Sequence, residues 1–318
     1  MCNTITIHCW LLLLCNFSRM CESGTRILDK YVLRERIGSG AFGEVWNADT
    51  SGTTDEPVAV KMEFIEGNPA PTLQYESRVL QLLQGAQGIP RLRYFGRNES
   101  MNRIFMVTEL LGASLETLAT SQRLDMTPHV IKKPPPYHAE FISDIGRQML
   151  QRLKSIHVGG MLHRDVKPDN FLFARTPALD LSRYANSKHN ADVPLLYIID
   201  FGMAKRIKSS DADTGKKGSL IGSARYASVA AHRGEALGRK DDLISMMYSL
   251  IYVANGGALP WQNYAEKEIQ YIKENMTPTE LCVEMCARHA DGWSAILDRL
   301  YAMKVSDAPD YAKIESLI

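Results

Sequence analysis

One short polar segment constrains this chain more than any other feature. Residues 161–172 read MLHRDVKPDNFL and bring Asp165, Lys167 and Asn170 into one loop. A carboxylate at such a position can accept a hydroxyl proton, a lysine can steady a moving phosphoryl group, and an asparagine oxygen can help to hold Mg²⁺. The segment fits H-R-D-L-x-x-x-N except for valine in place of leucine, and it therefore predicts a phosphoryl-transfer site.

A glycine-rich stretch earlier in the chain is predicted to form a hairpin. Residues 37–45 read IGSGAFGEV and fit G-x-G-x-x-G-x-V through Gly38, Gly40 and Gly43. Glycine leaves room for backbone N–H groups to approach phosphate oxygens. A dinucleotide-binding site would need a helix directly after the glycines, whereas a strand-like stretch follows here. A tight hairpin without a ligand explains the stretch equally well in isolation, and the surrounding motifs favour a cover for phosphates.

An apolar strand and a helix supply a predicted ion pair. Lys61 ends the stretch VAVK at residues 58–61, where it is expected to contact nucleotide phosphates. Residues 73–83 have helical spacing, and Glu76 lies on the same stripe as the leucines. A carboxylate on an apolar face is costly unless it is paired, so we expect Glu76 to bind Lys61. The alternative is a surface glutamate that reaches out to solvent.

A second carboxylate completes the predicted metal site. Asp200 follows the apolar run at residues 196–199 and begins the tripeptide DFG. Mg²⁺ prefers oxygen ligands, which Asn170, Asp200 and nucleotide phosphates would supply together. The glycine loop, lysine, glutamate and three loop residues occur in the order expected of one phosphoryl-transfer site, which predicts ATP and Mg²⁺ as cofactors.

A segment further downstream narrows the resemblance. Residues 222–232 read GSARYASVAAH where most protein kinases carry Ala-Pro-Glu, and residues 259–262 read LPWQ. With these motifs, the chain from Tyr31 to its C-terminus resembles the casein kinase 1 family, which includes casein kinase 1 proper and the tau-tubulin kinases. Residues 238–243 are similar to the tau-tubulin kinases and residues 169–172 to casein kinase 1 proper, so both branches stay open.

The resemblance implies a serine/threonine protein kinase. A lysine two residues after Asp165 is typical of kinases that phosphorylate serine and threonine hydroxyls of proteins. The resemblance assigns Asp165, Lys167, Lys61 and Glu76 to catalysis and assigns the metal to Asn170 and Asp200. The residues that it assigns to nucleotide binding lie in the glycine loop, the strands and the hinge: Ile37, Gly38, Gly40, Gly43, Val45, Ala59, Lys61, Glu109, Leu111 and Leu172.

The resemblance also implies an α+β fold with two lobes. We expect a disordered leader over residues 1–29, then a small lobe over residues 30–112 with five antiparallel strands and the helix of Glu76. A larger, mainly helical lobe is expected over residues 113–318. Asp242 is expected in a buried helix, where it would bond the backbone of the loop around Asp165, and a solvated acid at a helix N-terminus is the alternative. The main helices of this lobe are expected at residues 140–157, 241–254 and 293–303.

One departure from the family pattern concerns substrate choice. Casein kinase 1 family members prefer acidic or already phosphorylated substrates through a small basic site, and Gly215 stands where its arginine would be. No lysine follows residues 259–262 at the matching place. Lys216, Lys217 or Arg225 could substitute, or the two lysines are a solvated loop pair. Because arginine grips phosphate with two nitrogens and lysine does not, we expect weaker selectivity for phosphorylated substrates.

Charge and cysteine content limit the remaining possibilities. A net charge of +1 gives no argument for nucleic acid, and no apolar stretch reaches the ~18 residues of a transmembrane segment. Four of the six cysteines fall within residues 1–21, which favours a disordered leader or an unused upstream start over a lipid-modified tether. Cys282 and Cys286 are expected to be packed thiols. We expect a monomer in the cytoplasm, with the nucleus as the alternative.

Two other function classes compete with a protein kinase. A kinase-like scaffold without catalysis would be expected to lack Lys61, Asp165, Asn170 or Asp200, and all four are present. A small-molecule phosphotransferase would not need the segment at residues 222–232, which resembles a platform for protein substrates. The sequence therefore favours an ATP-dependent protein kinase, with the silent scaffold as the alternative.

Overall fold

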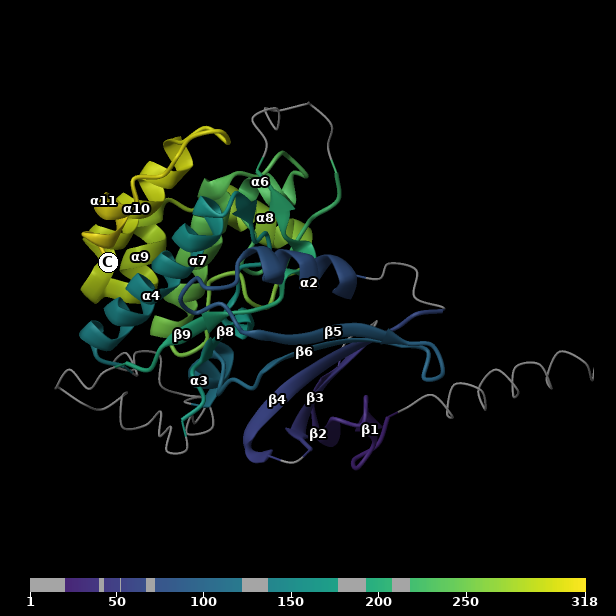
Figure 1. Cartoon of the computed structure of the whole chain (residues 1–318). Helices are drawn as coiled ribbons and strands as arrows, with labels where there is room; N and C mark the ends of the chain where they lie inside the picture. The colour runs from purple at the N-terminus through teal and green to yellow at the C-terminus, as the bar shows by residue number, and fades with distance from the viewer. Residues whose placement is uncertain are drawn as a thin grey trace, which may run out of the picture. The chain divides into compact units, whose positions relative to one another are not determined.

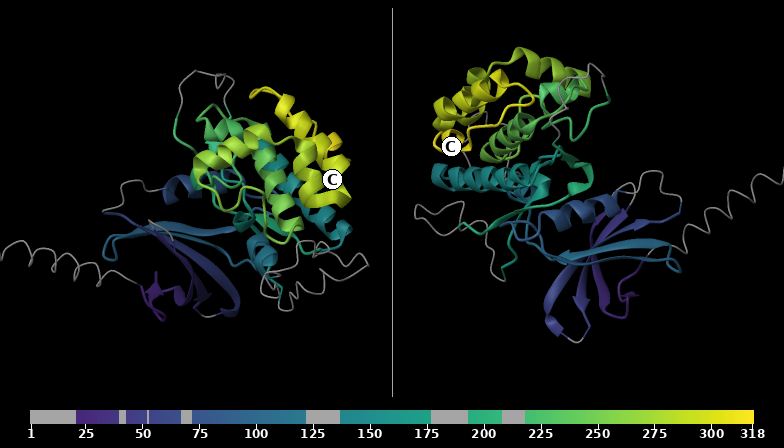
Figure 2. Two further views of the ribbon diagram at one scale, coloured as in Figure 1. Left: turned by 180° about the vertical axis from the view of Figure 1, so that it is seen from behind. Right: turned by 45° about the horizontal axis from the view of Figure 1, so that its top comes forward.

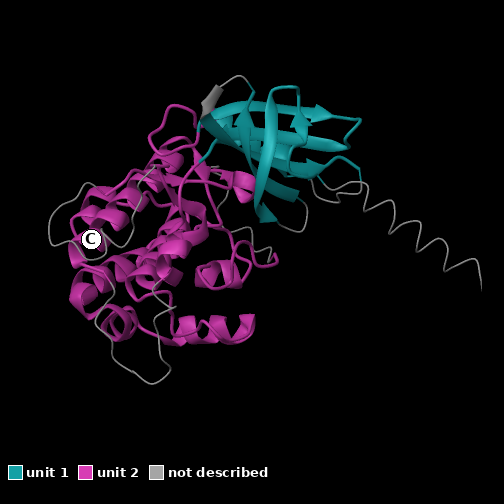
Figure 3. Cartoon of the chain, turned by 90° about the horizontal axis from the view of Figure 1, so that it is seen from below, with its two compact units in different colours: residues 1–81, 91–110 teal, residues 82–90, 111–318 magenta. Residues whose placement is uncertain are grey.

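The computed structural model describes residues 21–39, 43–51, 53–66, 72–121, 137–176, 193–207 and 218–318. The chain forms two compact units, which we call the sheet unit (residues 1–81 and 91–110) and the helical unit (residues 82–90 and 111–318) (Figure 3). An antiparallel sheet in one unit and helices in the other confirm the predicted α+β fold with two lobes. Outside the described part lie Gly40, Gly215, Lys216 and Lys217, and also Cys2, Cys9 and Cys15, which are three of the four cysteines within residues 1–21.

The sheet unit is built on a six-stranded antiparallel sheet with the order β1-β2-β3-β4-β6-β5 (Figure 1). The sheet has one strand more than predicted. The additional strand, β1, lies in the stretch that was expected to be a disordered leader, and it pairs with β2. Ile27 of β1 is fully buried, so apolar burial explains why this stretch joins the sheet. The strands are β1 (Arg26–Ile27), β2 (Tyr31–Ser39), β3 (Gly43–Thr50), β4 (Thr53–Phe64), β5 (Leu92–Asn98) and β6 (Arg103–Glu109).

Alternating side chains give the central strand β4 one face toward the core and one toward the candidate site. Ala59 and Lys61 are partly exposed on one face. This alternation is the two-residue period of a β-strand. Lys61 pairs in register with Val45 on β3 and with Met106 on β6, so it lies in the middle of the sheet. The side chains of β4 in the main apolar cluster are Val58, Val60 and Met62.

Cys21 packs against the sheet unit. It is partly buried beside the main apolar cluster, and this burial raises the pKa of its thiol. A lipid tether, which was considered for the cysteines of the leader, does not suit a thiol in this position. The other three leader cysteines lie outside the described residues.

The helical unit contains the helices that the sequence predicted, with slightly different ends. α4 covers the stretch expected at residues 140–157, while α7 and α10 begin earlier than predicted. The helix of Glu76 is α2 (Leu73–Leu82) and begins in the sheet unit. The helices of the helical unit are α3 (Leu115–Ser121), α4 (Ala139–Val158), α6 (Val229–His232), α7 (Arg239–Ala254), α8 (Glu266–Asn275), α9 (Pro278–Cys286), α10 (Ala290–Ala302) and α11 (Tyr311–Glu315).

Helix α7 is the centre of the core of the helical unit. All of its residues from Asp241 to Ala254 are buried, as is typical of a helix that is surrounded by other elements. α4, α9 and α10 pack against it, and Figure 2 shows this group from two further sides. Two carboxylates at the beginning of α7, Asp241 and Asp242, are buried with the apolar side chains and must therefore find partners.

Two short strand pairs fix both ends of the loop around Asp165. β7 (Met161–Leu162) pairs with β10 (Lys205–Arg206), and β8 (Phe171–Phe173) pairs with β9 (Leu196–Ile198). The loop leaves β7 and reaches β8 through one 3₁₀ turn. Its polar residues are therefore held between two anchored strands.

The described residues contain no helix that is long and apolar enough to cross a membrane. Cys282 and Cys286 are buried, which confirms that they are packed thiols. Burial raises the pKa of Cys282 to about 12. Within the described part of the chain, no group of three or more His, Cys, Asp or Glu side chains is placed to hold a metal ion.

Candidate active site

The predicted ion pair between Lys61 and Glu76 is present in the sheet unit. Lys61 Nζ donates to Glu76 Oε2 at 2.7 Å. The Glu76 side chain is 3% exposed and that of Lys61 28% exposed, so the carboxylate does not reach out to solvent. A buried carboxylate that pairs with a partly exposed ammonium fixes that ammonium and leaves part of it open to a ligand.

A second carboxylate on β4 positions the helix that carries Glu76. Glu63 is buried, and its oxygens accept hydrogen bonds from Thr72 N (3.0 Å), Thr72 Oγ1 (2.8 Å) and Leu73 N (3.1 Å). A carboxylate at these N–H groups satisfies donors that a helix leaves unpaired and interacts favourably with its dipole. Glu63 was not predicted from the sequence, although its place two residues after Lys61 puts both side chains on one face of the strand.

The described part of the glycine loop consists of residues that pair across two antiparallel strands. Gly38 pairs with Val45 across β2 and β3. A Cβ atom at Gly43 would collide with the carbonyl oxygen of Met62, so this position requires glycine. Ile37 is 51% exposed and is therefore not a core residue.

The hinge residues assigned by the resemblance are divided between the two units. Glu109 ends β6, and its Oε1 accepts a hydrogen bond of 2.7 Å from Arg91 N in the sheet unit. Leu111 belongs to the helical unit, where the next residue, Gly112, donates its N–H to Phe173 O at 2.9 Å. Leu172 on β8 is partly exposed and forms a bridge with Ser114.

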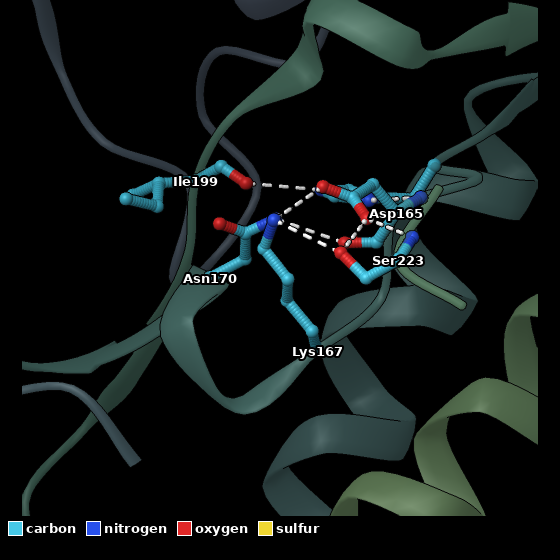
Figure 4. Close-up of polar contacts among 6 residues, drawn as sticks. Asp165, Lys167, Asn170, Ile199 and Ser223 are labelled. Carbon is cyan, nitrogen blue, oxygen red and sulfur yellow. Dashed lines mark hydrogen bonds and ion pairs between the residues drawn. The ribbon is translucent and has the colours of Figure 1, made fainter. Parts of the chain in front are cut away.

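The loop between β7 and β8 brings the predicted catalytic residues of the helical unit together (Figure 4). Lys167 Nζ donates to Asp165 Oδ2 at 2.7 Å. Asn170 Nδ2 donates to the backbone oxygen of Asp165 at 2.8 Å, which fixes the loop as a compact turn. Asp165 is largely buried, so its carboxylate is confined to a narrow set of partners.

Ser223 is a further partner of Asp165. Its N–H and its Oγ each donate to Asp165 Oδ1 at 3.0 Å, and Lys167 Nζ lies 3.3 Å from its Oγ. Gly222 permits this approach, because it has a φ of 85° and a Cβ atom there would lie 2.6 Å from Arg164 O. The contact of Ser223 with Asp165 was not predicted, since nothing in the local sequence indicates a contact between residues 58 positions apart.

The prediction for Asp242 is confirmed. Asp242 is buried in α7, and its Oδ2 and Oδ1 accept hydrogen bonds of 2.8 Å from His163 N and Arg164 N. His157 Nε2 lies 2.9 Å from Asp242 Oδ2, and Tyr311 OH lies 2.7 Å from His157 Nδ1. Because a carboxylate only accepts, we place the imidazole proton on Nε2, so that Nδ1 accepts from the tyrosine.

The partners of Asp242 also explain its charge state. Burial by itself raises the pKa of a carboxyl group, but the hydrogen bonds that Asp242 accepts from the His157 ring and from the backbone N–H of His163 outweigh it, and the pKa of Asp242 is lowered. A carboxylate that stays ionised can hold the two backbone N–H groups of the loop over a wide pH range.

The two predicted metal ligands lie on neighbouring segments. Ile199 N donates to Asn170 O at 2.9 Å, so Asp200, the next residue, follows directly after a backbone bond to Asn170. The amide nitrogen of Asn170 is turned toward Asp165, and its amide oxygen points away from Asp165 (Figure 4). An amide oxygen and a carboxylate suit Mg²⁺, a hard cation that takes oxygen ligands. These residues therefore fit the metal.

Arg225, a possible replacement for the missing arginine of the family's basic site, lies beside two aromatic rings. Its guanidinium lies 5.9 Å from the ring of Tyr226 and 5.8 Å from that of Tyr252. Burial by itself would lower the pKa of Arg225, but the nearby Tyr226, Tyr252 and Glu116 outweigh it and raise the pKa. The side chain is thus engaged inside the helical unit.

Comparison with protein families agrees with this geometry. A family model described as "Protein kinase domain" matches residues 31–306. The match includes every residue assigned above to catalysis, nucleotide binding or the metal.

Proposed function

This chain belongs to the protein kinase family, and we propose that it transfers the γ-phosphoryl group of ATP to serine and threonine hydroxyls of proteins as a casein kinase 1-type enzyme. The observation that carries the proposal is the cluster of Asp165, Lys167 and Ser223. Lys167 and Ser223 together hold both carboxylate oxygens of Asp165, which keeps this group oriented toward an incoming hydroxyl.

In the proposed reaction, Asp165 accepts the proton of the acceptor hydroxyl. The hydroxyl oxygen forms a bond to the γ-phosphorus while the bond from that phosphorus to the β-phosphate oxygen breaks, so that ADP leaves. Lys167 lies beside Asp165 and would stabilise the negative charge that spreads over the transferred group. The Lys61 ammonium, fixed by Glu76, would contact the α- and β-phosphates.

Asn170 and Asp200 would hold Mg²⁺ in this proposal. The metal, when bound, supplies positive charge that neutralises the β- and γ-phosphate oxygens. The contribution of the protein is to orient two oxygen ligands, through the Asn170 bond to the Asp165 backbone and the Ile199 bond to Asn170. His163 adds a third constraint, because its Nε2 lies 3.0 Å from Ile199 O.

Contacts between the family motifs support the casein kinase 1 assignment. Ser228 from the segment at residues 222–232 donates to Asp241 Oδ1 at 2.7 Å, and Trp261 Nε1 from the LPWQ segment donates to Arg225 O at 2.8 Å. Two motifs that resemble the same family thus contact each other or the same helix. Such contacts support a common role in shaping the site for a protein substrate.

The direct test is an initial-rate assay of the full chain with Mg²⁺ and ATP on three matched acidic peptides that differ only in a serine, threonine or tyrosine acceptor. We expect turnover of the serine and threonine peptides alone. Asp165→Asn should lower kcat by about 10²–10⁴-fold, because general-base catalysis contributes about that much. Asp169→Asn is the matched control, since Asp169 is exposed in the same loop.

Each outcome of this assay separates one alternative. Equal turnover of the tyrosine peptide would overturn the serine/threonine assignment. Binding of ATP without turnover of any peptide would favour the silent scaffold. An Asp165→Asn variant as active as the wild type would remove Asp165 from the mechanism.

Substrate choice, assembly and location complete the proposal. The engagement of Arg225 with aromatic rings supports weak selectivity for already phosphorylated substrates. A peptide with phosphoserine three residues before the acceptor should therefore react at about the rate of its unphosphorylated match.

We also propose a monomer in the cytoplasm or nucleus, which sedimentation of the purified chain and imaging of a tagged chain would check.

A further inference from the structure

Lys273 is a buried lysine that the proposed mechanism does not use. It lies on α8 one turn after the buried Ile269, and it is 4% exposed. Its Nζ donates to Ala224 O at 2.8 Å and to Ala227 O at 2.7 Å. Among the described residues no carboxylate pairs with it. A buried ammonium without a counter-ion is costly, and these two carbonyl groups, together with His232 Nε2 at 3.3 Å from Nζ, offset part of that cost.

Aromatic rings form the walls around this ammonium. Lys273 Nζ lies 5.0 Å from the ring centre of Tyr248 and 5.0 Å from that of Trp261. Faces of aromatic rings attract cations, which offsets part of the cost of burial. Trp261 also donates its own Nε1–H to Arg225 O at 2.8 Å. The two side chains together therefore bind three backbone carbonyl groups of one short segment.

We call this segment, residues 223–228, the strap. It is a turn rather than a helix or a strand, in which Tyr226 N and Ala227 N donate to Ser223 O at 2.9 and 3.0 Å. Further bonds from outside the segment hold this turn in place. At one end Ser223 bonds Asp165, and at the other end Ser228 Oγ donates to Asp241 Oδ1. Lys273 and Trp261 bind the carbonyl groups between these two ends.

The strap lies where the chain of a substrate must pass. An acceptor hydroxyl that gives its proton to Asp165 has to come within hydrogen-bond distance of that carboxylate. Ser223 already touches the same carboxylate. The residues on either side of the acceptor must therefore run along the strap, and its shape decides how well they fit.

We infer that Lys273 is a positioning residue for the protein substrate, which holds the strap in the shape that receives the residues flanking the acceptor. This inference rests on the proposed function and adds a specificity-determining residue to it. Lys273 touches neither the nucleotide residues nor the acceptor. Its replacement should therefore change the Michaelis constant for the peptide and kcat. The Michaelis constant for ATP should stay unchanged.

The variant Lys273→Met tests the inference, because methionine fills a similar volume but cannot donate. We expect the KM for the serine peptide to rise by about tenfold, since the strap loses two charge-assisted hydrogen bonds. The KM for ATP, and the slow hydrolysis of ATP in the absence of peptide, should stay within about twofold. Lys273→Arg keeps the charge and the donors and should recover part of the peptide affinity.

The matched control is Lys267→Met, which removes an exposed lysine from the same helix and should leave all constants unchanged. If Lys273→Met only lowers the melting temperature and leaves the KM for the peptide unchanged, the role of Lys273 is merely structural and the inference is overturned. A parallel rise in the KM for ATP would also overturn it.

A milder variant covers the case that Lys273→Met does not fold. Trp261→Phe keeps an aromatic ring beside Lys273 but removes the donor to Arg225 O, and we expect about a threefold rise in the KM for the peptide. No change in that variant would overturn the inference. The wild type separates this failure from failure of the proposed function. If the wild type transfers no phosphate to any peptide, the proposed function is wrong. If the wild type transfers phosphate normally and the variants are unaffected, only the role of Lys273 is wrong.

Discussion

Two segments that meet at Asp165 are held by opposite chemistry. The catalytic loop, residues 163–170, is held by hydrogen bonds that its backbone N–H groups donate to the buried carboxylate of Asp242. The strap, residues 223–228, is held through backbone carbonyl groups to which the buried ammonium of Lys273 donates. In both cases a charged side chain far away in the sequence replaces the bonds that a helix or strand would supply.

The difference lies in how the two buried charges are compensated. Asp242 is accompanied by His157 and His163, and its pKa is lowered despite burial. Lys273 has no carboxylate partner among the described residues, and burial lowers its pKa well below the ordinary value. The catalytic loop is therefore held by a carboxylate that stays ionised, whereas the strap is held by an ammonium whose charged form is disfavoured by burial.

The largest effect is expected from Asp242→Asn. The amide can accept only one of the two backbone bonds well and leaves His157 without its partner, so the free energy of unfolding should fall by about 3–5 kcal/mol. Urea unfolding measures this change, and kcat should fall as the loop around Asp165 loosens. Asp144→Asn, on the partly exposed surface of α4, should change neither. A stable, fully active Asp242→Asn variant would remove Asp242 as the anchor of the loop.

The second prediction concerns acid. The pKa of His232, which lies 3.3 Å from Lys273 Nζ, is lowered to about 4 by burial and by the charge of Lys273. An unfolded chain binds this proton near pH 6.5, so between pH 6.5 and about 4 the unfolded state binds more protons than the folded state. The contribution of the neutral imidazole is therefore complete above pH 6.5 and is lost as the pH falls toward 4.

Urea unfolding at pH 7.5 and 4.5 checks this prediction. The wild type should lose about 1–3 kcal/mol more than His232→Gln between the two values. His138→Gln, at the N-terminus of α4, is the control and should follow the wild type. An equal loss in all three proteins would show that His232 is not responsible for the acid sensitivity of the strap.

The bond that joins the two segments should matter less than their anchors. Ser223→Ala removes the hydroxyl that donates to Asp165 but leaves the backbone N–H, so kcat should fall by about tenfold, as for one hydrogen bond to a charged group. Ser223→Thr should keep most of the activity, because it keeps the hydroxyl. Ser219→Ala changes an exposed serine nearby and is the control. Unchanged kcat in Ser223→Ala would show that the two segments act independently.

The smallest effect is expected at the outer end of the Asp242 network. Tyr311→Phe removes the hydroxyl that donates a hydrogen bond to His157 Nδ1. The free energy of unfolding should fall by about 1 kcal/mol, and kcat should change by less than threefold. Tyr264→Phe, at a tyrosine that is 52% exposed, is the matched control. A loss as large as that of Asp242→Asn would mean that the tyrosine, and not the carboxylate, anchors the loop.

Local pattern was sufficient for part of the site. Glu76 was predicted to pair with Lys61 because helical spacing puts its carboxylate on an apolar face, where only a cation can compensate it. Asp242 was predicted from the family resemblance alone, and its bonds to the loop are present. The catalytic loop is also local, because Asp165, Lys167 and Asn170 bond one another within a few residues.

The remaining contacts could not be predicted in the same way. Glu63 binds the beginning of α2 across a segment whose course the sequence does not indicate. β1 was assigned to a leader because two residues are too short for a periodic pattern. Lys273 looks like an ordinary solvated lysine in a polar helix, and only its neighbours in space reveal its burial.

The chemistry of the loop around Asp165 and the family of the chain could be predicted from the motifs and their order in the sequence. These follow from residue types at short spacing, where bond geometry leaves few arrangements open. The burial of Lys273, in contrast, follows only from the tertiary structure. Lys273 is buried because carbonyl groups 46 and 49 residues away converge on its ammonium. Such convergence depends on the packing of α8 against the strap, which no local pattern contains.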